Sequence, residues 1–320
     1  MNYKLKKISG DASFREFYRL KNNNKTSIIV SAQKEKFKNL AVYTVINNVL
    51  NNNKINAPKL LSNYYKNDMI EISDLGEKSY YDHVISKKNK LNSYKSLIIL
   101  LIKIQKIKVK KFYKFERFKI KIPKYTLTNL HKESDLFFDW YLKYFLKNKK
   151  INRIKKILRA ELNKVYKKLN YKNDTFVHRD FHISNIMIHK NKLGIIDSQD
   201  AIIGNPLYDV SSVIDDVRIK LSNKLQKKLL DFYHLNSKLK KDQIQKLKND
   251  FDILSVQRNL KILGIFVRLY KRDNKDNYLK YLPYTWILIE KRLQNPELKN
   301  LKTLFYKHLP IKKLKNLNKI

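Results

Sequence analysis

One polar segment, set inside a stretch that is otherwise typical of helix, most constrains the fold. Residues 176–197 are FVHRDFHISNIMIHKNKLGIID, a short apolar entry and a polar loop followed by two short apolar runs. The runs Ile186–Ile188 and Leu193–Ile196 predict two strands, and Lys190-Asn191 between them predicts a hairpin turn. Loops held by such a rigid support commonly carry chemistry, so we expect the functional residues here.

The residues before this segment divide into a sheet-rich part and a helical part. Residues 15–20 alternate in character and predict a strand, Asn22–Asn24 predicts a turn, and Ser27–Val30 predicts a second strand. A helix is expected over residues 37–44, a turn at Asn51–Asn53 and a strand at Met69–Ile72. We therefore expect an α+β fold, with a small antiparallel-sheet N-lobe at residues 1–73 and a mainly helical C-lobe at residues 74–320.

Helical periodicity dominates the second part of the chain. The run Ile151, Ile154, Leu158, Leu162, Val165 and Leu169 gives the clearest amphipathic stripe. Gly264 interrupts another helical run, although glycine inside a helix costs about 1 kcal/mol relative to alanine. That cost predicts that a neighbouring backbone packs closely against Gly264.

Composition excludes several classes of protein. The chain has no cysteine, so disulfides, thiolate metal sites and cysteine nucleophiles are excluded. The longest strongly apolar run, Leu97–Ile102, is too short to cross a bilayer, and we expect no membrane insertion. The start of the chain has no apolar signal-peptide core, so we expect a cytoplasmic location.

The formal net charge of +42 has two interpretations. It could indicate binding to nucleic acid or to an anionic membrane, or a bias toward lysine along the whole chain. The basic residues are spread throughout and no nucleic-acid module is visible, so we expect no specific nucleic-acid partner. A positive field would still attract anionic substrates such as ATP.

The polar loop matches the pattern H-R-D-x-x-x-x-N, followed by a second aspartate at the end of the hairpin. Phosphoryl transfer to a hydroxyl needs a group that accepts its proton, and Asp180 suits that role. Asn185 and Asp197 offer the hard oxygen ligands that Mg²⁺ prefers. A rival interpretation takes His178, Asp180 and His182 as transition-metal ligands, but no further cluster completes that set.

These residues also carry a family resemblance. The segment at residues 178–216, which starts HRDFHISN and ends VSSVIDD, resembles the aminoglycoside-phosphotransferase superfamily of small-molecule kinases. The segments GDASFREFYRL, ESDLFFDWYL and VQRNLKILGIFVRL are similar to the bacterial N-acetylmuramate/N-acetylglucosamine anomeric kinases. The matching segments run from residue 10 to about residue 283.

The resemblance implies a protein-kinase-like bilobal fold and an ATP- and Mg²⁺-dependent reaction. The phosphate acceptor implied is the anomeric C1 hydroxyl of N-acetylmuramate or N-acetylglucosamine, in cell-wall recycling. The alternatives are a kinase of another small hydroxyl compound, aminoglycoside- or choline-like, and a non-catalytic protein that is kinase-like or binds nucleic acid. Intact Asp180, Asn185 and Asp197 argue against the last. We expect a monomer that binds ATP and a sugar.

The resemblance also implies the nucleotide contacts. The residues in the place of a glycine-rich phosphate loop are Gly10, Asp11, Ala12, Ser13 and Phe14. The run from Glu71 to Asp74 resembles the hinge that meets adenine, although an ordinary connector has the same composition. Ser27–Ala32 holds no lysine that would bind the phosphates, which leaves Arg19 and Lys34 as candidates.

Substrate contacts are predicted more loosely. The candidates beside the catalytic residues are Arg179, His182, Gln199 and Asp200, and those farther along the chain are Asp139 and Trp140. The aromatic face of Trp140 could pack on a sugar ring, whereas the alternative is an ordinary core position. Asp209 resembles the aspartate at a helix start that supports the catalytic loop, and aspartate there is also a common helix cap.

Overall fold

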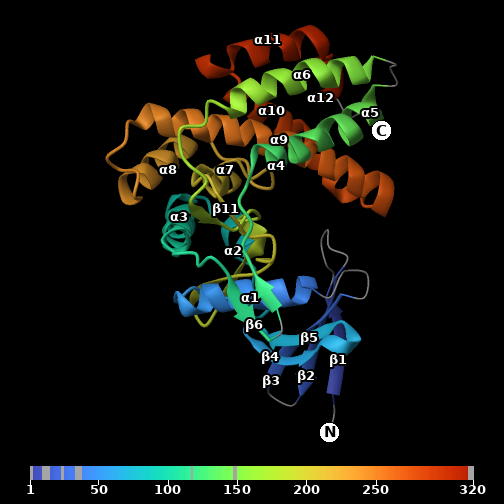
Figure 1. Cartoon of the computed structure of the whole chain (residues 1–320), viewed down its shortest axis with the longest axis vertical. Coiled ribbons are helices and arrows are strands. Elements are labelled where there is room, and N and C mark those ends of the chain that lie inside the picture. Colours follow the sequence, from blue (N-terminus) through green and yellow to red (C-terminus); the bar gives the residue numbers. More distant parts are fainter. Residues whose placement is uncertain are drawn as a thin grey trace. The chain divides into compact units, whose positions relative to one another are not determined.

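The computed structural model describes residues 3–8, 15–22, 25–32, 38–116, 118–146 and 150–315, with Tyr3 and Lys38 described by their backbone alone. The chain forms two compact units (Figure 1). The sheet unit comprises residues 1–123 and 176–203, and the helical unit comprises residues 124–175 and 204–320. The lobe boundary predicted between residues 73 and 74 is a different division of the chain, and it stays a prediction.

The sheet unit is built on a five-stranded antiparallel sheet. Its strands are β1 (Tyr3–Ile8), β2 (Glu16–Asn22), β3 (Lys25–Ser31), β4 (Leu60–Tyr64) and β5 (Met69–Ser73), in the order β1-β2-β3-β5-β4. The strands predicted around residues 15–20, 27–30 and 69–72 are confirmed as β2, β3 and β5. The sequence interpretation missed β1 and β4, where lysine and asparagine weaken the apolar alternation.

Helix α1 (Lys38–Asn52) lies across one face of this sheet (Figure 1). Its Leu40 and Tyr43 join a buried cluster with five residues of the sheet and its ends, namely Ile28, Val30, Ala32, Ile70 and Ile72. Burying this apolar face is what holds an isolated sheet and helix together, since the hydrophobic term scales with the apolar area removed from water.

The turn predicted at Asn51–Asn53 is wrong at its first two residues, because α1 continues through Asn52. The Asn51 side chain donates a hydrogen bond to the carbonyl of Asn47 at 2.9 Å, one turn back, and another to the carbonyl of Ala57 at 3.1 Å. These bonds satisfy carbonyls near the helix end. The reversal follows at Lys54, whose φ of 61° is left-handed.

The rest of the sheet unit includes the polar loop and its hairpin. Its elements are η1 (Tyr65–Asn67), α2 (Tyr80–Ile85), α3 (Leu91–Gln105), β6 (Tyr113–Phe115), β7 (Phe118–Ile120), η3 (Ile183–Asn185), β9 (Ile186–His189) and β10 (Lys192–Ile195). Strands β8 (Thr175–Val177) and β11 (Ile202–Gly204) span two points where the chain passes between the units. The predicted hairpin is confirmed as β9 and β10, which pair antiparallel.

The helical unit is organised around its long helix α9. Its elements are α4 (Leu127–Leu136), η2 (Phe137–Leu142, a π-helical turn), α5 (Lys143–Phe145), α6 (Ile151–Tyr166), α7 (Leu207–Ile214), α8 (Asn223–Asn236), α9 (Ile244–Asp273), η4 (Asp276–Tyr281), α10 (Leu282–Arg292), η5 (Pro296–Leu298), α11 (Lys299–His308) and α12 (Ile311–Lys315). Helix α9 packs against α4, α7 and α10, and α6 packs against α11 (Figure 1). The α+β class, with its N-terminal sheet and mainly helical remainder, is confirmed.

The predicted stripe of α6 is buried. Ile154, Leu158, Leu162 and Val165 are all less than 9% exposed, as expected for the apolar face of an amphipathic helix. Leu169, the last member of the predicted stripe, lies beyond the end of α6.

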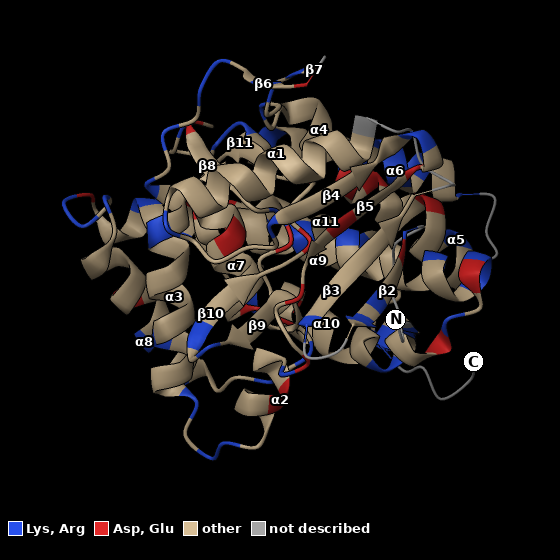
Figure 2. Ribbon diagram, turned by 90° about the horizontal axis from the view of Figure 1, so that it is seen from below, with Lys and Arg blue, Asp and Glu red and all other residues tan. Residues whose placement is uncertain are grey.

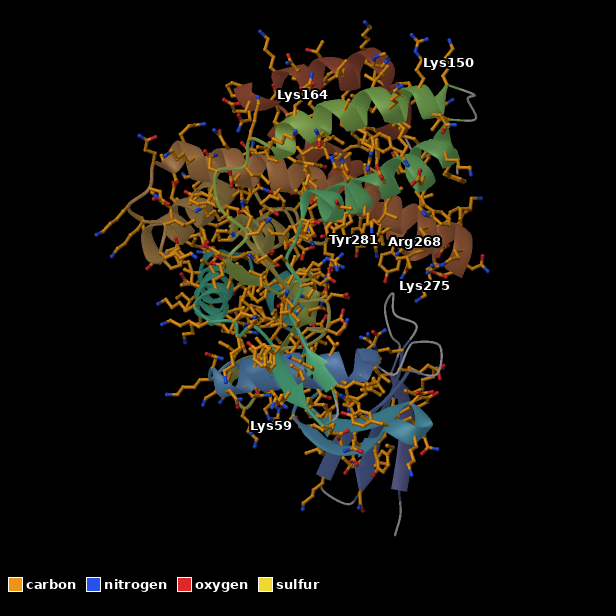
Figure 3. All side chains as sticks on the ribbon, in the orientation of Figure 1. Lys59, Lys150, Lys164, Arg268, Lys275 and Tyr281 are labelled. Atoms are coloured by element: carbon orange, nitrogen blue, oxygen red, sulfur yellow. The ribbon has the colours of Figure 1, made fainter. Side chains whose placement is uncertain are left out.

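Basic residues are distributed over both units. Figure 2 shows Lys and Arg on helices, strands and loops rather than on one element. The labelled residues Lys59, Lys150, Lys164 and Lys275 in Figure 3 come from separate stretches of the two units. Within the described residues, no helix combines the length and the apolar character needed to cross a membrane.

Candidate active site

The loop before β9 is folded around the backbone carbonyl of Asp180. That oxygen accepts from the backbone N–H of His182 at 3.0 Å and from the side-chain Nδ2 of Asn185 at 3.0 Å. The N–H of Asn185 donates in turn to the carbonyl of His182 at 3.0 Å. Because the amide nitrogen of Asn185 is used inside the loop, its Oδ1 is the side-chain atom that can coordinate a cation.

The hairpin brings Asp197 back to Asn185. Strands β9 and β10 pair with Ile186 opposite Ile195, and the N–H of Ile196 donates to the carbonyl of Asn185 at 3.0 Å. The turn residues Lys190 and Asn191 have φ values of 49° and 59°, as a type I′ turn requires. Asp197 is the next residue after Ile196, so this backbone bond fixes its position near Asn185 along the hairpin.

The Asp197 carboxyl lies in a buried environment close to other negative charges. Burial and the negative charges of Asp180 and Asp200 together raise the pKa of this carboxyl to about 6, while a hydrogen bond from Gln199 and the charge of Arg15 oppose the rise. Asp180 and Asp197 are therefore close enough to repel each other. Its φ of 63° is unusual for a residue with a side chain, and strained backbone clusters at functional sites.

The residues present fit a magnesium ion. The Asp197 carboxylate and the Asn185 amide oxygen are hard donors, and a divalent cation would relieve the repulsion between Asp180 and Asp197. In the part of the chain that the structure describes, no three His, Cys, Asp or Glu side chains gather as a metal cluster. Such a small protein donor set is typical of Mg²⁺ bound jointly with substrate phosphates.

His178 is fully buried beneath the loop. Burial lowers the pKa of its imidazole to about 4, although the charge of Asp180 and the backbone of Ile196 and Asp180 oppose the shift. The ring packs edge-on against Phe181, with 6.1 Å between centroids. A neutral, enclosed ring in this position supports the loop as packing, and His178 does not join His182 and Asp180 in a metal cluster.

The four substrate candidates nearest the loop surround the same residues. Gln199 Nε2 lies 2.8 Å from Asp197 Oδ1 and 3.4 Å from Asp200 Oδ2. Arg179 forms an ion pair with Asp200 at 3.6 Å, and His182 Nε2 lies 3.3 Å from Asn185 Nδ2. The fold thus brings Arg179, His182, Gln199 and Asp200 to one place, and their contact with a substrate stays a prediction.

Two residues that the sequence interpretation missed tie this site to the sheet. Ser198, next to Asp197, donates its hydroxyl to Asn47 Oδ1 on α1 at 2.6 Å, and both residues are at most 2% exposed. The N–H of Ile195 donates to the carbonyl of Asn56 at 2.8 Å. The sequence did offer one indication of this contact. Asn47 is a polar residue among the apolar residues of α1, and a buried polar group requires a partner.

Gly194 on β10 lies in close contact with the same part of the sheet unit. A Cβ atom at that position would lie 2.9 Å from both Asn56 Nδ2 and Leu75 Cδ1. Glycine therefore allows β10 to approach these two residues, which follow α1 and β5 respectively.

The predicted nucleotide residues divide into those with and those without a described position. Gly10, Asp11, Ala12, Ser13, Phe14 and Lys34 lie outside the described residues. Glu71 lies on β5, opposite Ile29 of β3. The nucleotide-binding roles of all these residues stay predictions.

Arg19 holds the connector that follows β5. Its Nε lies 2.6 Å from Asp74 Oδ2, its Nη2 lies 3.2 Å from Asp74 Oδ1 and 3.1 Å from the carbonyl of Gly76, and Nη1 pairs with Glu77. Although burial works to raise it, the pKa of Asp74 is lowered by the hydrogen bonds from Arg19 and from the Gly76 N–H. A bidentate pair of this kind orients a connector firmly.

Comparison with known proteins identifies the family. A model of the phosphotransferase enzyme family matches residues 4–244, well over half of the chain. The chain belongs to this family. The predicted resemblance is therefore confirmed, and the protein is a small-molecule kinase that transfers phosphate to a hydroxyl group.

Individual relatives of this phosphotransferase carry a narrower name. An N-acetylmuramate/N-acetylglucosamine kinase of Pseudomonas aeruginosa is 27% identical over 302 residues, which cover 92% of this chain and 85% of the relative. A kinase of the same name from Neisseria meningitidis serogroup B is 23% identical over 286 residues, covering 88% and 83%.

A solved structure supports the fold. An aminoglycoside phosphotransferase in its ADP-bound form matches the phosphotransferase with a TM-score of 0.60 and 14% identity, covering 92% of this chain and 93% of that one. The protein-kinase-like fold class predicted from the sequence is confirmed by this likeness.

The remaining predicted site residues of the phosphotransferase lie in the helical unit. Asp139 is half exposed and pairs with Lys155 at 2.6 Å, and Trp140 is partly buried in the π-helical turn. Asp209 is fully buried in the first turn of α7. Their roles toward a sugar or toward the catalytic loop stay predictions.

The motif residues of the helical unit converge on Glu133. This buried carboxylate accepts from Tyr125 Oη at 2.6 Å, Tyr208 Oη at 2.9 Å and Gln257 Nε2 at 3.0 Å, and it pairs with Lys261 at 3.3 Å. The bonds join α4, α7 and α9. Two of the segments that carried the family resemblance, ESDLFFDWYL and VQRNLKILGIFVRL, thus contribute to one buried polar network, which spacing alone did not indicate.

Proposed function

We propose that this protein is an ATP- and Mg²⁺-dependent sugar kinase that phosphorylates the anomeric C1 hydroxyl of N-acetylmuramate and N-acetylglucosamine. The proposal rests on one observation, the set of hydrogen bonds that joins Asp180 to Asn185 and Asn185 to the residue before Asp197. The names of the curated relatives support the choice of sugar. The fold likeness to an ADP-bound phosphotransferase supports an adenine nucleotide.

In this proposal Asp180 accepts the proton of the attacking sugar hydroxyl. An anomeric hydroxyl is more acidic than an ordinary alcohol, which makes the proton transfer to Asp180 easier. Asn185, through Oδ1, and Asp197 would hold the magnesium, which supplies neutralisation of the charge that develops on the phosphates when it is bound. Most of the rate enhancement then comes from positioning and from electrostatic stabilisation.

Gln199 has a defined part in the same proposal. Its Nε2 bond to Asp197 Oδ1 at 2.8 Å holds one carboxylate oxygen, so the other is presented to the cation. Arg179 and Asp200, paired at 3.6 Å, lie where the incoming sugar or phosphate would be met. Cell-wall recycling, a cytoplasmic location and a monomeric state complete the proposal.

A screen of the purified protein tests this assignment. The acceptors are N-acetylmuramate, N-acetylglucosamine, an aminoglycoside and choline, each with ATP and Mg²⁺, and ³¹P and ¹³C NMR locate the phosphate on the product. We expect phosphate at C1 of the two amino sugars. The Asp180→Asn variant, run on the same panel, excludes a contaminating kinase.

The alternative acceptors have a clear outcome in the same screen. A strongly cationic aminoglycoside calls for an acidic pocket, which a chain of net charge +42 does not favour. Phosphorylation of choline or the aminoglycoside without phosphorylation of either sugar would replace the proposed substrate. Phosphate found at a sugar position other than C1 would refute the anomeric assignment.

A further inference from the structure

Arg268 on α9 is a half-buried cation that has no partner among the residues that the structure describes. Its side chain makes neither a hydrogen bond nor an ion pair with them, and its Nε is buried. The nearby carboxylate of Asp273 is held by Arg272, through Nε at 2.8 Å and Nη2 at 2.9 Å. Because a buried donor without a partner is costly, an external anion would complete this arginine.

The electrostatic surroundings of Arg268 also favour an anion. Burial and the positive charge of Arg272 lower the pKa of the Arg268 guanidinium, while the charge of Asp273 opposes the shift. An arginine stays protonated in proteins, so it remains a cation in this unfavourable environment. A bound carboxylate would offset both the loss of solvent and the repulsion from Arg272.

Helical spacing sets Arg268 on the face of α9 that meets α4. Arg268 follows Lys261 by seven positions and Gly264 by four, so the three residues share one face. Lys261 pairs with Glu133 of α4 at 3.3 Å. A Cβ atom at Gly264 would lie 2.3 Å from backbone atoms of Leu136, the last residue of α4. The next turn of this face therefore lies beside η2, which continues α4 and packs against α9.

Trp140 lies in the part of η2 that runs beside this turn of α9. Contacts advance in the same direction along the two segments. Leu136 meets α9 at Gly264, and Tyr144 meets it at Tyr270, with 6.0 Å between the ring centroids. Trp140 is four residues from Leu136 and four from Tyr144, so it shares their face and lies between these two contacts.

The indole of Trp140 is also available to a ligand. The side chain is partly buried in the π-helical turn, and its N–H makes no hydrogen bond with the described residues. Turns of π-helix inside α-helices occur frequently at functional sites. An aromatic face with a free donor, on the same side of the helix pair as the unpaired Arg268, suits a sugar that carries a carboxylate.

We propose that Arg268 binds the lactyl carboxylate of N-acetylmuramate and thereby favours this acid over N-acetylglucosamine. The inference rests on the proposed function, since it names the residue that distinguishes the two proposed substrates. These sugars differ in one group, a lactyl ether whose carboxylate is charged at neutral pH. A guanidinium fork holds a carboxylate through two parallel hydrogen bonds. Trp140 stays the candidate that packs on the pyranose ring, which both sugars share.

Initial-rate kinetics of the full chain with the two sugars test this contact. Arg268→Met keeps an apolar side chain and removes the charge. We expect the KM for N-acetylmuramate to rise about 10- to 100-fold with little change in kcat, while both constants for N-acetylglucosamine stay at their wild-type values. Arg268→Lys keeps a point charge but loses the fork, and we expect a smaller rise of about three- to tenfold.

A neutral form of the substrate provides the same test without a mutation. The methyl ester of the lactyl carboxylate keeps the shape of N-acetylmuramate and removes its charge. We expect the wild-type protein to show a KM for the ester about 10- to 100-fold above that for the acid. Arg268→Met should use acid and ester equally, because removing both partners of one interaction costs no more than removing either.

Lys271→Met is the matched control. It removes one positive charge from an exposed position of α9, where the Lys271 ammonium lies 4.5 Å from the centre of the Tyr144 ring. We expect its KM values for both sugars to equal those of the wild type. The KM for MgATP should be unchanged in all three variants, and melting temperatures verify that they are folded.

Each outcome decides the point. A wild-type KM for N-acetylmuramate in folded Arg268→Met overturns the proposal, and so does equal use of acid and ester by the wild-type protein. An equal rise in the KM for N-acetylglucosamine, or an equal effect of Lys271→Met, also overturns it. A rise confined to the KM for MgATP assigns Arg268 to the nucleotide phosphates instead.

Failure of the proposed function has a different result. If the wild-type protein phosphorylates neither sugar, the proposed function fails and this inference fails with it. If it phosphorylates N-acetylglucosamine and not N-acetylmuramate, the inference about Arg268 fails while the protein remains a sugar kinase.

Discussion

At the level of single residues, the site depends on which polar atoms are already satisfied within the protein. Asn185 uses its amide nitrogen on the Asp180 carbonyl and thereby keeps its oxygen for a cation. Asp197 has one oxygen held by Gln199. The backbone carbonyl of Asp180 is bonded within the loop, and its side chain is the proposed proton acceptor.

Replacing Asp180 by asparagine tests the proposed proton acceptor. The amide has the same shape but cannot accept a proton from the sugar hydroxyl, so we expect kcat to fall by about 10²- to 10⁴-fold. Nucleotide binding should be retained, because the loop is held by backbone atoms of residue 180. Steady-state kinetics with a calorimetric measurement of MgADP binding provide the check. A variant with wild-type kcat would contradict the assignment of Asp180.

Asp252 predicts a pH effect on stability away from the site. Burial raises the pKa of its carboxyl to about 6 from the ordinary 3.8, although Arg292 and Asn295 oppose the shift. Below pH 4 the group is protonated in both the folded and the unfolded state. Between pH 4 and 6 the unfolded state loses this proton first, so the contribution of Asp252 to the free energy of unfolding falls as the pH rises.

Asp252→Asn should therefore gain stability relative to wild type, by on the order of 1–2 kcal/mol, as the pH rises from 4 to 7. The free energy of unfolding of both proteins is measured by urea titration at several pH values. The exposed Thr303→Ala, which removes no titratable group, serves as a control and should show a difference that does not change with pH. A constant difference for Asp252→Asn as well would mean that its pKa is not raised.

At the level of elements, contacts between segments distant in sequence decide how helices and strands meet. The bond from Ser198 to Asn47 joins α1 to the residue after Asp197. The network around Glu133 joins α4, α7 and α9 in the helical unit. Gly264 lets α9 approach α4 so closely that a Cβ atom there would lie 2.3 Å from the carbonyl carbon and oxygen of Leu136.

Gly264→Ala should destabilise the protein although alanine favours helix. The intrinsic gain of about 1 kcal/mol is outweighed, because backbone atoms of Leu136 cannot move aside without separating the two helices. We expect a net loss of about 1–3 kcal/mol, measured by chemical denaturation. Lys246→Ala, on the exposed face of α9, should stay within about 0.5 kcal/mol of wild type. Unchanged or increased stability of Gly264→Ala would refute the close contact.

At the level of the whole molecule, the high positive charge acts through its field. The basic residues are distributed over both units (Figure 2), so they form no single stripe in that view and instead raise the potential broadly. Such a field attracts anionic substrates over distances comparable with the Debye length, about 8–10 Å at physiological salt.

The field predicts a salt effect that distinguishes the two proposed substrates. Raising KCl from 50 to 300 mM should increase the KM for MgATP about two- to tenfold, while the KM for the neutral N-acetylglucosamine stays nearly constant. Initial-rate measurements, repeated with an uncharged osmolyte in place of salt, provide the comparison. Equal changes for the two substrates would indicate a general effect of salt on the enzyme.

Local spacing was sufficient to predict the hairpin that carries the candidate site and the fold class. Within the loop and hairpin over residues 176–197, the internal bonds join residues at most about twelve positions apart, as in the Asn185–Asp180 bond and the β9–β10 register. The turn at Lys190-Asn191 needs only residues that tolerate positive φ. Contacts of this short range depend on the local order of residues. The sequence was therefore sufficient to predict where Asp180, Asn185 and Asp197 lie along the loop and hairpin.

Partners across long sequence separations were decided by the tertiary structure. Arg19 pairs with Asp74, 55 residues away, and Ser198 bonds to Asn47, 151 residues away. Charge and spacing do not specify such pairs, because any buried polar group can be satisfied by several others until packing selects one. By itself, then, the sequence predicted the loop and hairpin that carry the candidate residues, whereas packing decided which distant partners Arg19 and Ser198 meet.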